Sequence, residues 1–71
     1  MLESRKILSD NMKRLRNENT LTQEDLADRT GLHRTYISDV ERCERNISID
    51  CIDKIAEAFG ITASELLKEQ K

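Results

Sequence analysis

The sequence predicts a single all-α domain of five helices over residues 1–71. Its composition suits short loops between amphipathic helices, because the chain has no proline, two glycines and 37% charged residues. Apolar residues recur at intervals of three and four along most of the chain, which is the spacing of one helix face. Almost no segment alternates apolar and polar residues as a half-buried strand does. These three observations together favour an all-α fold.

The first helix is expected over residues 1–19. Leu8, Met12 and Leu15 fall at i, i+4 and i+7, and Ile7 lies beside this stripe. The opposite face is polar, and we interpret it as a solvated face. It carries Lys6, Lys13, Arg14 and Asn17.

Residues 22–42 predict two short helices joined by a tight turn. Thr22 is a suitable N-cap, because its hydroxyl can accept a hydrogen bond from a free amide one turn into the helix. Gly31 is expected to end the first of these helices, since a residue without a β-carbon adopts the left-handed conformation at little steric cost. The second helix would bury Ile37 and Val40, one turn apart. Its other residues are polar, so this segment has the helix-turn-helix pattern, with a second helix suited to the DNA major groove.

The fourth helix is expected over residues 48–59, with Ser48 as its cap and Gly60 as its end. Its stripe at i, i+3, i+4 and i+7 is the clearest amphipathic pattern in the chain and should close the core. This stripe consists of Ile52, Ile55, Ala56 and Phe59.

The fifth helix is expected over residues 62–69, where Thr62 and Glu65 have the spacing of a capping box. Leu66 and Leu67 are adjacent, so one should pack inward and the other should lie on a spare apolar surface. A core this small supplies only ~3–5 kcal/mol, and dimerisation is a common supplement. A monomer with a frayed C-terminal helix is the alternative. The candidate dimer-interface residues are Ile49, Ile61, Leu66 and Leu67.

Several blocks of the chain resemble a known family. They are LTQEDLA at 21–27, Gly31-Leu32, RTYIS at 34–38 and ERCERNIS at 41–48. These blocks resemble the helix-turn-helix family of the lambdoid phage repressors and Cro, and within it the controller proteins of bacterial restriction–modification systems. The similarity extends from about Met12 to Leu67.

This resemblance implies a five-helix, lambda-repressor-like DNA-binding domain with the helix-turn-helix at its second and third helices. It also implies a transcriptional regulator that binds double-stranded DNA as a homodimer on a palindromic operator, and that times a restriction endonuclease gene. A phage-type repressor and the DNA-binding subunit of an antitoxin are alternatives within the same class.

Five residues are candidates for contact with base edges. Arg34 can hold guanine O6 and N7 through two hydrogen bonds, which discriminates against a wrong base by ~1–3 kcal/mol. Asp39 can accept from cytosine N4 or can instead orient a neighbouring arginine. Tyr36 can direct its hydroxyl to DNA or can pack wholly in the core. The resemblance to controller proteins places the second arginine of the following loop at the bases. The set is Arg34, Thr35, Tyr36, Asp39 and Arg45.

Five further residues are candidates for contact with phosphates. Gln23 begins the first helix of the motif, where its side chain and amide can bind a phosphate, although a plain surface glutamine is the alternative. The loop over residues 42–47 should lie over the phosphates that flank the groove. The set is Gln23, His33, Ser38, Arg42 and Asn46.

The resemblance also implies an ion pair between Arg16 and Glu41. Such a pair fixes the angle between helices more than it adds net stability, and removal of one partner strands the other charge. Family members often carry glycine at the position of Cys43, just past the helix end. A cysteine there predicts local strain or a different exit path for the chain.

The formal net charge of −2 is unusual for a DNA-binding domain, which is commonly basic. Residues 1–45 hold nine basic and nine acidic side chains, whereas residues 46–71 hold three and five. The excess acid therefore lies away from the expected DNA face. We expect modest affinity for random DNA and good discrimination. The acidic balance mildly favours a protein-binding adaptor on the same fold, but the arginines of RTYIS and RCERN oppose it.

The sequence predicts neither an enzyme nor a metal or cofactor site. It has no paired-carboxylate, nucleophile–base or metal-ligand pattern, and His33 is its only histidine. Cys43 and Cys51 are expected to be free thiols in a reducing cytoplasm rather than a regulatory disulfide or metal site. No apolar run approaches ~18 residues, so we expect a cytoplasmic protein with no membrane segment. No small-molecule ligand is expected either.

Overall fold

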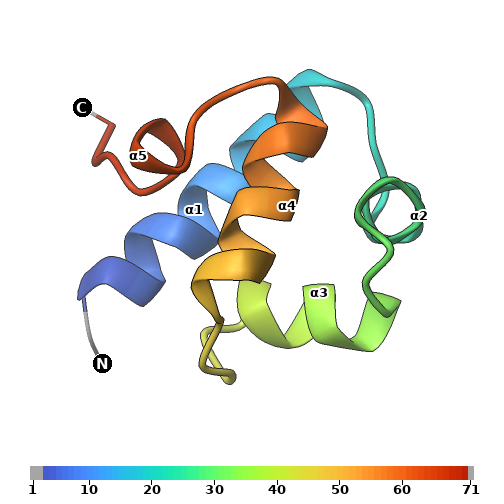
Figure 1. The fold of residues 1–71 in the computed structure, drawn as a ribbon, viewed down its shortest axis with the longest axis horizontal. Helices are drawn as coiled ribbons and strands as arrows, with labels where there is room; N and C mark the ends of the chain where they lie inside the picture. Colours follow the sequence, from blue (N-terminus) through green and yellow to red (C-terminus); the bar gives the residue numbers. More distant parts are fainter. Residues whose placement is uncertain (1–2, 71) are drawn as a thin grey trace.

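The computed structural model describes residues 3–70, and over this range it contains five α-helices and no strand (Figure 1). The predicted all-α fold class is confirmed. The helices are α1 (Glu3–Glu18), α2 (Gln23–Thr30), α3 (Arg34–Glu41), α4 (Ile49–Phe59) and α5 (Ala63–Leu66). The expected start of the first helix at residues 1–2 lies outside the described residues. None of these five helices is long and apolar enough to cross a membrane.

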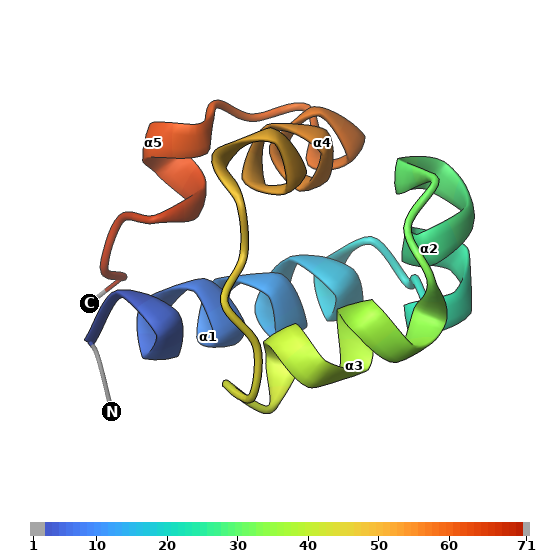
Figure 2. The same ribbon diagram turned by 60° about the horizontal axis from the view of Figure 1, so that its bottom comes forward.

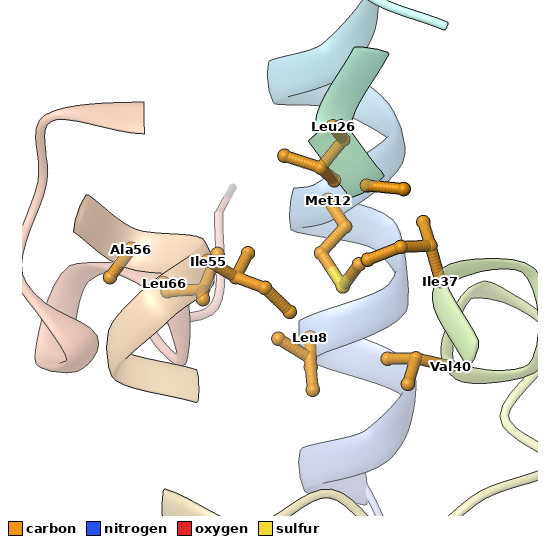
Figure 3. Close-up of a cluster of buried hydrophobic side chains, with 9 residues drawn as sticks. Leu8, Met12, Leu26, Ile37, Val40, Ile55, Ala56 and Leu66 are labelled. Carbon is orange, nitrogen blue, oxygen red and sulfur yellow. The ribbon is translucent and has the colours of Figure 1, made fainter. Parts of the chain in front are cut away.

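The core is built around α1. Figure 3 shows Leu8 and Met12 of α1 between side chains from α3 on one side and side chains from α4 and α5 on the other. Met12 is fully buried, and burial of one such side chain stabilises the fold by about 1.5–3 kcal/mol. The buried hydrophobic residues are Leu8, Met12, Leu26, Ala27, Ile37, Val40, Ile55, Ala56 and Leu66.

The helix ends are set by local sequence signals. The Thr22 hydroxyl accepts from the Asp25 amide at 3.0 Å, and the Asp25 carboxylate accepts from the Thr22 amide at 3.0 Å. Thr62 and Glu65 form the same reciprocal cap on α5. Gly31 adopts the left-handed conformation, with φ of 75°, and turns the chain from α2 into α3. These ends hold the two helices of the motif at a fixed spacing.

Two buried polar side chains of α1 tie distant segments to this helix. The Asn11 amide donates to the carbonyls of Leu66 and Lys68, at 2.7 and 2.9 Å. The Ser9 hydroxyl donates to the carbonyl of Glu41 at the end of α3. Helix ends leave carbonyls without intrahelical partners, and these two side chains satisfy some of them. Neither contact is predictable from local sequence, because its partners lie 32 or more positions apart.

The prediction that Leu66 belongs to a dimer interface is wrong. Its side chain is fully buried and lies in the core, because Asn11 holds the end of α5 against α1. Leu67 is the exposed member of the adjacent pair, and Ile49 at the start of α4 is 75% exposed. Ile61 packs partly against the core. The fifth helix also ends at Leu66, three residues before the expected end.

Cys43 adopts a left-handed conformation directly after α3, with φ of 61°. Its amide donates to the Val40 carbonyl at 3.0 Å, and its Sγ lies 3.6 Å from the Arg5 carbonyl oxygen of α1. The chain therefore exits α3 with a backbone conformation that favours glycine. Of the two possibilities raised by a cysteine at this position, local strain is the one observed.

Cys43→Gly is expected to stabilise the protein by up to about 1 kcal/mol. Glycine removes the steric cost of the left-handed conformation, which exceeds the extra backbone entropy that glycine loses on folding. The change is measured as an increase in the urea midpoint. Thr20→Gly is the matched control, because Thr20 also has positive φ, of 56°, and should be stabilised similarly. A lower midpoint for Cys43→Gly alone would show that the sulfur contact with α1 outweighs the strain.

Candidate nucleic-acid interface

The helix-turn-helix places α3 at the outer edge of the molecule. In Figure 2 α3 lies on the opposite side of the molecule from α4, with α1 beside it and α2 at its N-terminal end. Ile37 and Val40 anchor α3 in the core, and Leu32 packs partly against the core at the corner between α2 and α3. The side of α3 opposite Ile37 and Val40 is therefore presented outward, in the position that a DNA-reading helix requires.

Thr35 lies on this outward side, and Arg34 is the first residue of α3; both are exposed. Arg34 has no hydrogen-bonding or ion-pair partner among residues 3–70. A guanidinium without an intramolecular acceptor keeps its paired donors available for a guanine or a phosphate. His33 is also exposed and is the N-cap residue of α3, although its side chain makes no cap hydrogen bond.

A hollow of about 630 Å³ lies at the N-terminus of α2, next to Arg34. Backbone amides at a helix N-terminus and a nearby guanidinium both favour an anion, so the hollow suits a phosphate. Gln23 lines it, but its side-chain amide donates to Glu41 Oε1 at 3.1 Å, so the glutamine is oriented by α3. The lining residues are Arg16, Asn17, Thr20, Leu21, Thr22, Gln23, Glu24 and Arg34.

Arg16 and Glu41 form the ion pair that the resemblance implied. Arg16 Nε lies 2.7 Å from Glu41 Oε2, and Nη2 lies 2.9 Å from Oε1. The two side chains are 16% and 4% exposed. Arg16 Nη1 also donates to the Leu21 carbonyl at 3.0 Å. The hydrogen bond with Glu41 raises the pKa of Arg16. The pair thus links α1, the loop before α2 and the last residue of α3.

Asp39 binds two arginines from the segment that follows α3. Its Oδ1 lies 2.6 Å from Arg42 Nη2, and its Oδ2 lies 3.0 Å from Arg45 Nη2. Arg42 Nη1 donates to the Ser38 hydroxyl at 2.6 Å, and Arg42 Nε donates to Glu44 at 3.2 Å. Four of the predicted DNA-contact residues therefore form one connected network. Its predicted members are Ser38, Asp39, Arg42 and Arg45.

Tyr36 lies between this network and α4. The Arg45 guanidinium lies over the Tyr36 ring, 5.0 Å from its centroid, and the ring packs partly against the core. Burial, followed by contact with the Cys51 thiol, raises the pKa of Tyr36, so its hydroxyl stays protonated. Hydrogen bonding from Ser48, then from Tyr36, lowers the pKa of Cys51. Cys43 and Cys51 are free thiols.

The predicted DNA-contact residues thus form two groups, and three further residues lie outside both groups. Arg34 and Gln23 share the hollow at α2, whereas the Asp39 network gathers residues at the far end of α3. His33, Thr35 and Asn46 are exposed and belong to neither group. Asn17 at the end of α1 and Thr20 in the following loop also line the hollow and were not among the predicted site residues. The only sequence signal for them was their position just before the N-terminus of α2.

Comparisons with known proteins agree with this arrangement. The helix-turn-helix family model matches residues 12–66. Control protein C.SmaI of Serratia marcescens is 42% identical over 97% of this chain and 82% of its own length. The crystal structure of the hypothetical transcription factor NHTF from Neisseria matches this structure with a TM-score of 0.91 and 42% sequence identity. The match covers 94% of this chain and 77% of that one.

A third relative has been crystallised on DNA. The restriction-modification controller protein C.Esp1396I, as a tetramer in complex with its natural 35 base-pair operator, has a TM-score of 0.84 and 33% identity. The match covers 93% of this chain and 87% of that one. The chain therefore belongs to the helix-turn-helix family, in the group that includes the restriction–modification controller proteins.

Proposed function

We propose that this protein is a sequence-specific DNA-binding transcriptional regulator that acts as a homodimer on a palindromic operator. The observation that carries the proposal is the first turn of α3, where Arg34 is exposed and unpaired within residues 3–70 while Ile37 and Val40 of the same helix are buried. A rigidly anchored helix with a free guanidinium can place two parallel donors on guanine O6 and N7.

The surrounding residues have distinct roles in this proposal. Thr35 contacts a neighbouring base edge, and Arg45 reaches the bases from the end of α3, supported by the Tyr36 ring beneath it. The hollow at α2, with Gln23, holds one flanking phosphate, and residues of the loop after α3 hold phosphates on the other side. Phosphate contacts fix the register of the helix, whereas base contacts supply specificity. Two copies would place their α3 helices in successive major grooves, ~34 Å apart.

The most specific form of the proposal is a controller protein of a restriction–modification system. The likeness to C.SmaI and to C.Esp1396I supports it, because both matches span most of this chain and of the relative. In this role the protein binds its own operator and times expression of a restriction endonuclease. A phage-type repressor would have the same DNA-reading surface and differ in the genes it controls. Neither role requires catalysis by this chain.

Selection of bound duplexes from random DNA tests the proposal. We expect enrichment of a sequence with two related half-sites, whose centres lie one helical turn apart. The logarithm of the binding constant should fall linearly with the logarithm of salt concentration, by ~0.9 for each phosphate neutralised. A protein-binding adaptor would enrich no sequence at any salt concentration, and that result would contradict the proposal.

The proposed dimer interface lies around Ile49 and Leu67. Both are large apolar side chains with unusual exposure, 75% and 38%. Leu67 also lines a mainly apolar groove of about 240 Å³ between the start of α1 and α4, which Leu8 and Ile52 line as well. Burial of these side chains against a second copy would remove apolar area from water and supplement a small core.

Ile49→Glu and Leu67→Glu are each expected to weaken dimerisation at least about tenfold, because a carboxylate would be desolvated in an apolar interface. Sedimentation equilibrium at micromolar concentration measures this change. The controls Ile49→Leu and Leu67→Met keep the side chain apolar and should leave the dimer intact. A wild-type protein that sediments as a monomer throughout that range would refute the proposed interface.

A further inference from the structure

The carboxylate of Asp39 pairs with two arginines that the proposed function assigns to DNA. Each carboxylate oxygen serves one of them, Oδ1 for Arg42 at 2.6 Å and Oδ2 for Arg45 at 3.0 Å. Arg45 Nε also lies 3.4 Å from Oδ2. Charge-assisted bonds of this kind are roughly twice as strong as neutral hydrogen bonds. A phosphate that binds either arginine therefore competes with Asp39 for that guanidinium.

The two arginines differ in this respect from Arg34. All three guanidinium nitrogens of Arg42 are engaged, with Asp39, Ser38 and Glu44. Arg45 is fixed by Asp39 on one side and by the Tyr36 ring on the other. Arg34 has no comparable partner in the part of the chain that the structure describes. Helix α3 thus has one free arginine at its N-terminal end and two held arginines just beyond its C-terminal end.

The Asp39 side chain does not anchor α3 in the core. Its carboxylate bonds within residues 3–70 go to these two arginines. The link that stabilises the turn after α3 is made by the backbone instead, through the Glu44 amide and the Asp39 carbonyl at 2.9 Å. The helix itself is anchored by Ile37 and Val40. The carboxylate is therefore available for a role in recognition.

We propose that Asp39 is a specificity-determining positioning residue, which holds Arg42 and Arg45 in place and suppresses their binding to phosphates of random sequence. This inference rests on the proposed DNA-binding function. On random DNA the gain comes almost entirely from phosphate neutralisation, so competition from Asp39 removes a large share of it. On the operator, base contacts from Arg34 remain, and prior placement of Arg45 reduces the ordering cost of binding. Asp39 therefore lowers affinity for random DNA more than affinity for the operator.

The test compares Asp39→Asn with wild type on a selected operator duplex and on a random duplex, over about 50–200 mM salt. The amide keeps the shape of the side chain and removes its charge. We expect affinity for the random duplex to rise about tenfold, the effect of exchanging one charge-assisted bond. The salt slope on random DNA should steepen by about 0.9 for each arginine released. The ratio of operator to random affinity should fall.

Two further variants separate positioning from a general charge effect. Asp53→Asn makes the same change in net charge at an exposed position of α4 that has no arginine partner among residues 3–70. It should leave the salt slope and the affinity ratio close to those of wild type, because salt screens distant exposed charges. Asp39→Glu restores the charge and should return the salt slope toward the wild-type value, which a loss of helix packing would not predict.

The outcomes distinguish this inference from the proposed function. If wild type shows no preference among duplexes, the proposed function fails and the role of Asp39 fails with it. If wild type discriminates, and Asp39→Asn has the salt slope and affinity ratio of Asp53→Asn, only the role of Asp39 is refuted. If Asp39→Asn loses operator affinity with random affinity unchanged, the carboxylate contacts DNA directly and does not restrain the arginines.

Discussion

Arg34→Ala is expected to abolish the preference for one base pair in each half-site of the selected operator, at a cost of ~1–3 kcal/mol per half-site. Arg34 is unpaired within residues 3–70, and its neighbours His33 and Thr35 cannot supply two parallel guanidinium donors in its place. Alanine keeps the helix, because Arg34 is exposed and contributes nothing to the core. Competition binding against operators with single base-pair changes measures the loss.

Arg14→Ala is the matched control for this prediction. Arg14 lies on α1 in an exposed pair with Glu18, at 3.3 Å, so its removal makes the same charge change away from α3. The control should bind all operators almost as wild type does. Arg34→Lys should also lose discrimination, because an ammonium cannot reproduce the planar, two-pronged geometry. Equal weakening of Arg34→Ala on every sequence would show that Arg34 contacts only the DNA backbone.

The features that local sequence determines were predictable, and those that depend on distant contacts were not. The caps at Thr22 and Thr62 and the turn at Gly31 follow from residues one helical turn apart or less. The burial of Leu66 instead depends on Asn11, which is 55 positions away in the chain. Adjacent leucines show that only one can face a given core, but not which one. This is why the interface prediction named both.

In the candidate site, too, the local features were predictable and those that depend on distant contacts were not. The exposed position of Thr35 follows from the buried stripe of Ile37 and Val40, which the spacing of apolar residues reveals. Arg34 lies three residues before Ile37 and is exposed because it is the first residue of α3, at the end of the helix. The pairing of Asp39 with Arg42 is also local, because residues three apart are neighbours on a helix. The pairing of Asp39 with Arg45 is not, since it depends on how the chain leaves α3 at Cys43. A left-handed residue at that point reverses the chain and brings Arg45 back over Tyr36.

Glu41→Gln is expected to lower the free energy of unfolding by about 2–4 kcal/mol, somewhat less than the ~3–5 kcal/mol typical of a fully buried pair. Its side chain is 4% exposed and accepts from Arg16 and Gln23. The amide removes the negative charge and leaves the Arg16 guanidinium, which is 16% exposed, without a counter-ion. In a domain of this size such a loss lowers the melting temperature by at least about 8 °C. Thermal unfolding followed by circular dichroism measures it.

Two comparisons assign the effect to the stranded charge. Asp10→Asn also changes a carboxylate to an amide, but its pair with Lys6 is exposed on both sides, so we expect a loss of at most about 1 kcal/mol. Adding Arg16→Met to Glu41→Gln removes the stranded guanidinium and should recover much of the lost stability. An unchanged melting curve for Glu41→Gln would rule out an energetic role for the pair.

Since the pair also connects α1 to the last residue of α3, the double variant should regain stability without regaining wild-type discrimination between operators. That separation would assign the pair to the orientation of α3 rather than to net stabilisation.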